Sequence, residues 1–285
     1  MDRGFAETEN GRILAEMARN CRMIFFTGLP ASGKSFFLRE LISIAGNVGR
    51  CVHLIRWDAA LASFQTDEIL ASYPDVADGS HPIVRRAAGL WGRQAVARWL
   101  EMHPDDADVL IGEVPIVGNR FSELVKVLSD EVEAALASET TTFVYSVPTK
   151  EIRSKLEAIR RETFSNPKHS HEANDAPPAT MDLAWNLTCT KSIELGLLPS
   201  AEGESPRRYD EVLYRRFFDH LLRNRNAEAL DVDTLYASSG SAHDIQGDIF
   251  EIFATPREVA DAIAAIQADM DAEAATRAVE NWHRI

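Results

Sequence analysis

Short apolar runs recur along the chain and alternate with longer segments whose apolar residues are spaced as on one side of a helix. Runs that are apolar at nearly every position are typical of strands buried on both faces, as in a parallel sheet covered by helices. They predict five main strands, at 22–27, 51–57, 108–112, 141–147 and 228–233, and a sixth short strand or sheet edge at 248–253. The alternation therefore predicts an α/β fold with a five-stranded parallel sheet.

Helical spacing of apolar residues predicts helices between and after these strands. The expected ranges are 5–20, 34–45, 58–72, 82–102, 119–138, 149–163, 180–195 and 206–225, with one more helix after residue 255. Thr255 and Glu258 match the two ends of a capping box, and Pro256 stands at the first helical position, so the last helix is predicted to begin there. We expect a single domain over residues 1–285.

The segment Arg22–Ser35 reads RMIFFTGLPASGKS and joins an apolar run to a glycine-rich turn and a helix. It contains the pattern G-x-x-x-x-G-K-[ST]. Glycines at Gly28 and Gly33 allow backbone angles that a side chain forbids, so the following amides can point inward as a nest for an anion. The start of the helix adds free N–H groups and the positive end of its dipole. The alternative is an ordinary glycine-rich turn.

On these residues the chain resembles the P-loop NTPases, in which this pattern is the Walker A motif. The resemblance implies that MgATP is bound by seven residues: Gly28, Ala31, Ser32, Gly33, Lys34, Ser35 and Phe36. Lys34 is expected to reach the β- and γ-phosphates, and the Ser35 hydroxyl to ligate Mg²⁺. The kinase-like branch of the family also implies a three-layer fold with the strand order 2-3-1-4-5.

Asp58 follows the second apolar run, in HLIRWD. Ligands of open α/β sheets bind at the C-terminal ends of the strands, so side chains at these ends are candidates for chemistry. A carboxylate at this place could accept the proton of an acceptor hydroxyl. Small-molecule and polynucleotide kinases with a P-loop resemble this chain in carrying an aspartate after the second strand. The alternative role for Asp58 is to cap the next helix.

Three further residues are candidates for binding the substrate. Glu113 ends the third run and could ligate Mg²⁺, orient a nucleophile or contact substrate, or could be a solvated turn residue. Arg120 stands near a predicted helix start, where it could contact a substrate phosphate or lie on the surface. Residues 58–107 form a long helical connection, which we interpret as an insertion that binds the acceptor, with Arg93 among its contacts.

The predicted helix after the fourth strand is basic, although the chain as a whole is acidic. Arg153, Arg160 and Arg161 are spaced i, i+7 and i+8 and so share a broad face. In kinases of the adenylate kinase, uridine kinase and gluconokinase type, arginines at this place belong to a lid that neutralises the transferring phosphoryl group. The resemblance implies such a lid at 148–180, with these arginines as catalytic residues. The alternative is a solvated helix with i,i+4 ion pairs.

Composition narrows the classes of partner. The formal net charge of −14 disfavours nucleic acid, because an acidic surface repels phosphate backbones. No apolar run approaches the roughly 18 residues that span a bilayer, so we expect no membrane contact. The three cysteines, Cys21, Cys51 and Cys189, are unclustered, which indicates a reducing cytoplasm with neither a disulfide framework nor a zinc site. The sequence does not indicate an oligomeric state.

These observations favour an ATP-dependent phosphotransferase that moves the γ-phosphate of MgATP to a hydroxyl of a small metabolite. Two other functions stay open. The first is a nucleotide-binding regulatory ATPase or switch that acts on a protein partner. The second is a polynucleotide 5′-kinase, which Asp58 fits but the acidity of the chain disfavours. A GTPase is disfavoured because the chain has no N-K-x-D motif.

Overall fold

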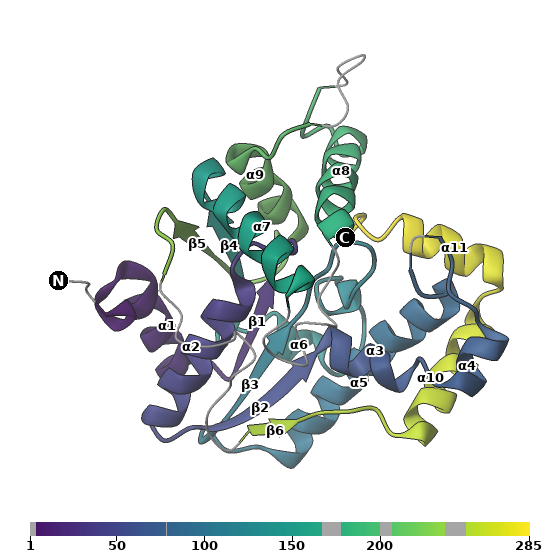
Figure 1. The fold of residues 1–285 in the computed structure, drawn as a ribbon. Coiled ribbons are helices and arrows are strands. Elements are labelled where there is room, and N and C mark those ends of the chain that lie inside the picture. The colour runs from purple at the N-terminus through teal and green to yellow at the C-terminus, as the bar shows by residue number, and fades with distance from the viewer. Residues whose placement is uncertain (1–3, 78, 167–177, 200–206, 237–248) are drawn as a thin grey trace.

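The computed structural model describes residues 4–77, 79–166, 178–199, 207–236 and 249–285 (Figure 1). Within them lies one sheet of six parallel strands in the order β5-β4-β1-β3-β2-β6. The strands are β1 Met23–Thr27, β2 Cys51–Arg56, β3 Asp108–Glu113, β4 Thr141–Pro148, β5 Ala227–Val232 and β6 Ile249–Glu251. The prediction of an α/β fold with a parallel sheet is confirmed, and the sheet contains the expected order 2-3-1-4-5.

The five-stranded sheet of the predicted fold class falls short by one strand, because the 248–253 segment, expected as a sixth short strand or a sheet edge, does form a strand. The sixth strand is β6, which pairs with β2 through Val52, His53 and Leu54 and leaves the outer edge open. Ile249 and Glu251 are half-buried and Phe250 is exposed, because an edge strand pairs on one side alone. The short stretch DIFEIF mixes charged with apolar positions for the same reason.

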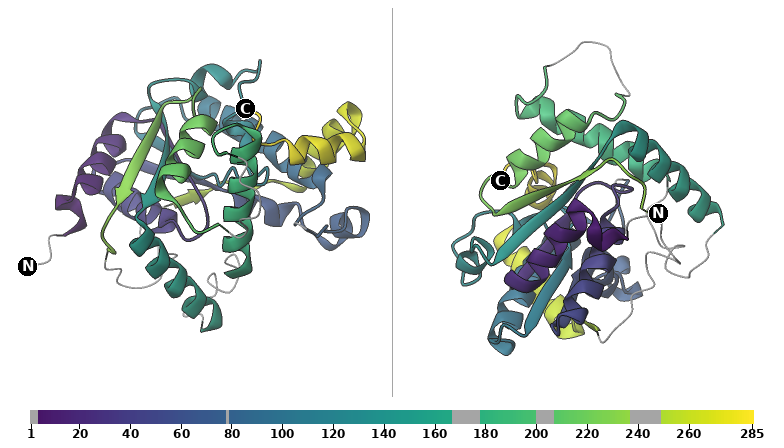
Figure 2. Two further views of the ribbon diagram at one scale, coloured as in Figure 1. Left: turned by 90° about the horizontal axis from the view of Figure 1, so that it is seen from above. Right: turned by 90° about the vertical axis from the view of Figure 1, so that its left-hand side faces the viewer.

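Helices cover both faces of the sheet (Figures 1 and 2). Alternate strand residues point to opposite faces, and they pack into two separate apolar cores. One core contains Phe25 and Leu110 together with side chains of α5 and α9, and the other contains Ile24 and Ile111 together with side chains of α1 and α2. The arrangement is compatible with a three-layer fold. None of the helices in the described residues has both the length and the apolar composition needed to cross a bilayer.

The helices begin and end close to the predicted positions in most places. They are η1 Phe5–Glu7, α1 Glu9–Asn20, α2 Lys34–Asn47, α3 Trp57–Ser63, α4 Asp67–Ser72, α5 Pro82–Met102, η2 Ser122–Leu124, α6 Glu133–Leu136, α7 Lys150–Ser165, α8 Pro178–Glu194, α9 Glu211–Leu221, α10 Pro256–Asp269 and α11 Ala272–Glu280. The capping box of Thr255 and Glu258 is present at the start of α10. The helix predicted over 58–72 is divided into α3 and α4, because Thr66 caps a new helix.

The helix predicted over 119–138 is absent apart from η2 and α6. Most of its apolar residues are buried as the spacing predicted, but in an irregular segment, and Leu128 is exposed. Arg93 donates hydrogen bonds to the carbonyls of Glu123 (2.6 Å) and Lys126 (3.1 Å), and Arg225 donates to those of Leu124 (3.2 Å) and Lys126 (2.6 Å). These carbonyls are the acceptors that a helix would use internally, so the two buried arginines replace the helical hydrogen bonds.

The structure describes nearly all of the insertion but only part of the lid-like region. Residues 58–107 contain α3, α4 and α5, and α5 packs against α10 and α11 on the side away from the sheet edge formed by β5 (Figure 1). In the lid-like region 148–180, α7 is described from its cap at Thr149 onward. Most of its polar loop, 167–177, lies outside the described residues, as does the expected start of a helix at residue 206.

Candidate functional site

The loop between β1 and α2 has an unusual backbone. Gly28, Ala31 and Gly33 all have positive φ, at 128°, 57° and 94°. A Cβ atom at Gly28 would lie 2.5 Å from the hydroxyl of Tyr214, so only glycine fits there. Among the described residues, no protein acceptor receives a hydrogen bond from the backbone amides of residues 33–35, which open α2. Three unpaired amides at a helix N-terminus suit an anion.

Side chains from three other elements hold this loop by its backbone. Ser146 on β4 donates from Oγ to the carbonyl of Ser32 at 2.8 Å, and Arg153 on α7 donates to the carbonyl of Pro30 at 2.6 Å. The amide of Leu29 donates to the Tyr214 hydroxyl of α9 at 3.3 Å. Sequence reasoning missed Ser146 and Tyr214. Ser146 lies near the end of a strand, where the strand-end rule could have found it, whereas nothing in the sequence marks Tyr214.

Lys34 is the charged centre of the site. Its side chain is almost fully buried, and its ammonium donates to the carbonyl of Leu29 at 2.8 Å. Burial lowers the pKa of Lys34 to about 8. The nearby carboxylates of Glu113 and Asp58 oppose this shift, and the guanidinium groups of Arg160 and Arg153 add to it. Four candidate residues from three separate segments therefore lie close enough to Lys34 to shift its pKa.

The two carboxylates of the site lie at the C-terminal ends of two neighbouring strands, Asp58 just beyond β2 and Glu113 at the end of β3. Asp58 is the second residue of α3, and its side chain is exposed. The cap position of α3 is Arg56, so capping by Asp58, the alternative role, is not observed. Glu113 is the last residue of β3 and is half-buried. Within the described residues, neither carboxylate forms a hydrogen bond or an ion pair, so both have oxygen atoms available for a proton or a cation.

Arg120 lies beside Asp58. Burial lowers the pKa of Arg120, the Asp58 carboxylate opposes that shift, and Arg85 adds to it. Within the described residues, the Arg120 guanidinium forms no hydrogen bond and no ion pair. The segment that carries it is strained: Ile116, Asn119 and Phe121 have φ near +60°. Left-handed residues without glycine cost free energy and concentrate at functional sites.

Of the three arginines of α7, Arg153 and Arg160 lie toward Lys34 and its loop, whereas Arg161 lies on the outer side of the helix. Arg153 is buried, binds Glu157 at 2.7 Å as well as Pro30, and lies over the ring of Tyr209 at 5.4 Å. Arg160 lies close enough to Lys34 to lower its pKa. Arg161 is half-exposed and pairs with Glu157 at 3.7 Å. The i,i+4 ion pairs of the alternative interpretation are therefore present on the outer side of α7, including Lys155 with Glu151 at 2.6 Å.

Arg93 does not take part in this group. The residue is 2% exposed, and its guanidinium binds Asp130 through two nitrogens, at 2.6 and 2.5 Å, and Glu133 at 2.9 Å. With the carbonyls of Glu123 and Lys126, these acceptors engage all five N–H groups that an arginine has. No donor remains for a substrate, so the expected substrate contact is replaced by a structural role in the 123–133 segment.

Comparisons with known proteins assign this chain to no family. The chain matches no protein-family model and no curated protein sequence. The candidate site therefore rests on the residues and their arrangement alone.

Proposed function

We propose that the chain is an ATP-dependent phosphotransferase that moves the γ-phosphate of MgATP to a hydroxyl of a small metabolite. The observation that supports this most is the gathering of Asp58, Glu113, Arg153 and Arg160 around the buried ammonium of Lys34. A site that only binds nucleotide needs the loop and the lysine. Phosphoryl transfer requires in addition a carboxylate that has no partner and arginines close to the loop and the lysine.

In this proposal the 28–35 segment is a P-loop. The amides of residues 33–35 and the Lys34 ammonium fit the phosphates of ATP, because they are donors without a competing anionic partner among the described residues. Ser35 and Glu113 are the oxygen donors for Mg²⁺, which in such sites neutralises charge on the phosphates. Ala31, Ser32 and Phe36 complete the segment, with Phe36 at the third position of α2.

Asp58 is the proposed base. Its exposed carboxylate is placed to accept the proton of the acceptor hydroxyl as that oxygen attacks. Arg120 is close enough to Asp58 for that carboxylate to affect its pKa, and it has no hydrogen-bond or ion-pair partner among the described residues, so we assign it to an anionic or strongly polar group of the acceptor. Arg153 and Arg160 are assigned to the charge of the transferring phosphoryl group. Arg161 remains in the proposed lid only as a residue that reaches the site through movement of α7.

The decisive experiment measures phosphate transfer from ATP across a panel of metabolites that carry hydroxyl groups. We expect slow ATP turnover alone and a large rise with one class of acceptor. Asp58→Asn is expected to lower transfer at least about a hundredfold while ATP binding, measured by calorimetry, stays unchanged. Asp67→Asn is the matched control, since Asp67 is an exposed aspartate in the first turn of the neighbouring helix α4.

The two other functions give different results in the same experiment. A regulatory ATPase or switch would bind ATP and then a protein partner, with no acceptor raising turnover. A polynucleotide 5′-kinase would transfer phosphate to an oligonucleotide rather than to a metabolite. If Asp58→Asn transfers phosphate as fast as the unaltered chain, Asp58 is not the base. We expect the reaction to take place in the cytoplasm, without nucleic acid or membrane.

A further inference from the structure

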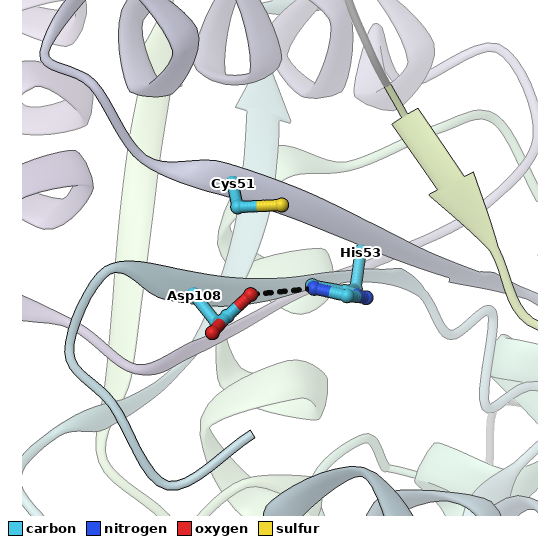
Figure 3. A group of neighbouring side chains, drawn as sticks. All are labelled: Cys51, His53 and Asp108. Atoms are coloured by element: carbon cyan, nitrogen blue, oxygen red, sulfur yellow. Dashed lines mark hydrogen bonds and ion pairs between the residues drawn. The ribbon is translucent and has the colours of Figure 1, made fainter. Parts of the chain in front are cut away.

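A second cluster of side chains lies at the opposite end of the sheet from Asp58 and Glu113. Cys51 opens β2, and Asp108 opens β3 directly beside it in the register of the two parallel strands. His53 stands two residues further along β2, so its side chain leaves the same face as that of Cys51. Figure 3 shows the three side chains directed toward one another from the two strands.

The three donor atoms are close together. The Cys51 sulfur, a ring nitrogen of His53 and a carboxylate oxygen of Asp108 all lie within 4.8 Å of one another. His53 Nε2 is 2.8 Å from Asp108 Oδ1 (Figure 3). Ligands of a tetrahedral zinc ion lie roughly 3.5 Å apart, given bonds of about 2.0–2.3 Å. Shifts of about 1 Å would therefore convert the cluster into a coordination site.

A fourth candidate ligand, His103, lies beside two of these three residues, Asp108 and His53. His103 follows the last residue of α5, and its Nδ1 lies 3.5 Å from Asp108 Oδ1. Its ring centroid is 4.0 Å from that of His53. Aromatic side chains surround the two imidazoles: Trp99 contacts both rings, and Phe250 of β6 stacks on His53 at 5.4 Å. An apolar surround of this kind limits the access of water to a bound metal.

We propose that Cys51, His53, Asp108 and His103 bind a zinc ion. Thiolate, imidazole and carboxylate are the three kinds of ligand that zinc takes in proteins, and four of them complete a tetrahedral structural site. One thiolate and one carboxylate balance the charge of a divalent cation, with two neutral imidazoles. The ion would fasten the end of the long insertion helix α5 to the end of the sheet at which β2 and β3 begin. It lies away from the proposed phosphate site and does not depend on the proposed function.

The unclustered cysteines predicted no zinc site. The ligands come from two strands and the end of one helix. Cys51 and Asp108 alone are more than 40 residues apart in the sequence. Only the parallel register of β2 and β3 brings them together. The local signals were a C-x-H pair at the start of a strand and a histidine five residues before Asp108.

The test uses the full chain without an affinity tag, stripped of metal and titrated with Co²⁺ and then Zn²⁺. We expect one equivalent of Co²⁺ to produce a thiolate-to-cobalt absorption band and a tetrahedral d–d spectrum, both lost when Zn²⁺ displaces it. The chain has three cysteines, so the band can be assigned. Cys51→Ser should abolish it, whereas Cys21→Ser and Cys189→Ser should leave it unchanged.

Affinity provides the second measurement. His53→Gln and His103→Gln are each expected to raise the Kd for Zn²⁺ at least about tenfold, as is usual when a site loses a ligand or its close partner. Absence of a thiolate band from the unaltered chain would overturn the proposal, and this result does not depend on any variant folding. A band that survives in Cys51→Ser would also overturn it. Unchanged affinity in His103→Gln would overturn the four-ligand site.

Discussion

Arg153 on α7 donates a hydrogen bond to the carbonyl of Pro30, in the loop between β1 and α2, at 2.6 Å. The same guanidinium binds Glu157 one turn along its own helix, at 2.7 Å. Helix α7 is therefore attached to the loop that would hold the phosphates, through a side chain that is 2% exposed. Binding of nucleotide and the position of α7 are expected to influence each other because they share this contact.

Replacing Arg153 tests this link. Arg153→Met removes the hydrogen bond to Pro30 and one positive charge beside Lys34, so we expect kcat to fall at least about tenfold and ATP binding to weaken. The measurement is steady-state phosphate transfer together with calorimetric ATP binding. Lys155→Met is the control, because Lys155 is half-exposed on the same helix and pairs only with Glu151 among described residues. Equal losses in both variants would refute the specific role of Arg153.

The stability of the nucleotide-free chain should depend on the charge of Lys34. Burial lowers its pKa from 10.5 to about 8, so the folded state holds this proton less tightly than the unfolded state. Stability is therefore reduced below pH 8 and rises as the pH increases from about 8 to 10.5. The full difference corresponds to roughly 3 kcal/mol. Urea unfolding at several pH values measures it.

Lys34→Met is the matched control for this pH dependence. Other groups titrate in the same range, and they contribute equally to both chains. We expect the variant to be the more stable protein at pH 7.5 and to show a shallower rise in stability with pH. A phosphate-bearing ligand such as pyrophosphate should reduce the rise in the unaltered chain, since an anion favours the charged lysine. Parallel pH profiles of the two chains would show that Lys34 is not the cause.

Gly28 should be intolerant of any side chain. Gly28→Ala places a methyl group 2.5 Å from the Tyr214 hydroxyl at a φ of 128°, so we expect a loss of at least about 2 kcal/mol of stability and loss of ATP binding. Gly49→Ala is the comparison, because Gly49 also has positive φ, at 81°, but has open space around it. The double variant Gly28→Ala with Tyr214→Phe should recover part of the stability. No recovery would mean that backbone strain alone accounts for the loss.

Glu133 should contribute to resistance against acid. Burial alone would raise its pKa, but hydrogen bonds from Arg225, the Leu128 amide and Arg93 outweigh burial and lower the pKa to about 2. The stabilisation is present above pH 4.5 and is lost as the pH falls toward 2. Its size is about 3 kcal/mol at neutral pH. Glu133→Gln should therefore unfold at lower urea concentration at pH 7, and this difference should shrink by pH 3.

The same measurement on Glu131→Gln provides the control, because Glu131 is an exposed carboxylate two residues away. We expect its unfolding to match that of the unaltered chain at both pH values. An equal difference between Glu133→Gln and the unaltered chain at pH 7 and pH 3 would contradict the assignment, since it would mean that the lost stability does not depend on ionisation.

The sequence pattern predicted those elements of the fold that depend on residues close together in the chain. The apolar runs at β1 to β5, the capping box at Thr255 and the glycine pattern before α2 depend on residues a few positions apart. The helix expected over 119–138 failed for a different reason. Its spacing is helical, but Arg93 and Arg225, which lie far away in the sequence, take the carbonyls that the helix needed.

Only the tertiary structure decided which of the candidate residues meet. Parallel strands align their equivalent ends, so Glu113, Asp58 and Lys34 gather at one end of the sheet, while Cys51 and Asp108 gather at the other. The sequence alone determined that the segment Arg22–Ser35 joins an apolar run to a glycine turn and a helix. It did not determine that Arg93 donates all its hydrogen bonds inside the protein while Arg120 has no hydrogen-bond partner among the described residues, because burial and competing partners depend on distant parts of the chain.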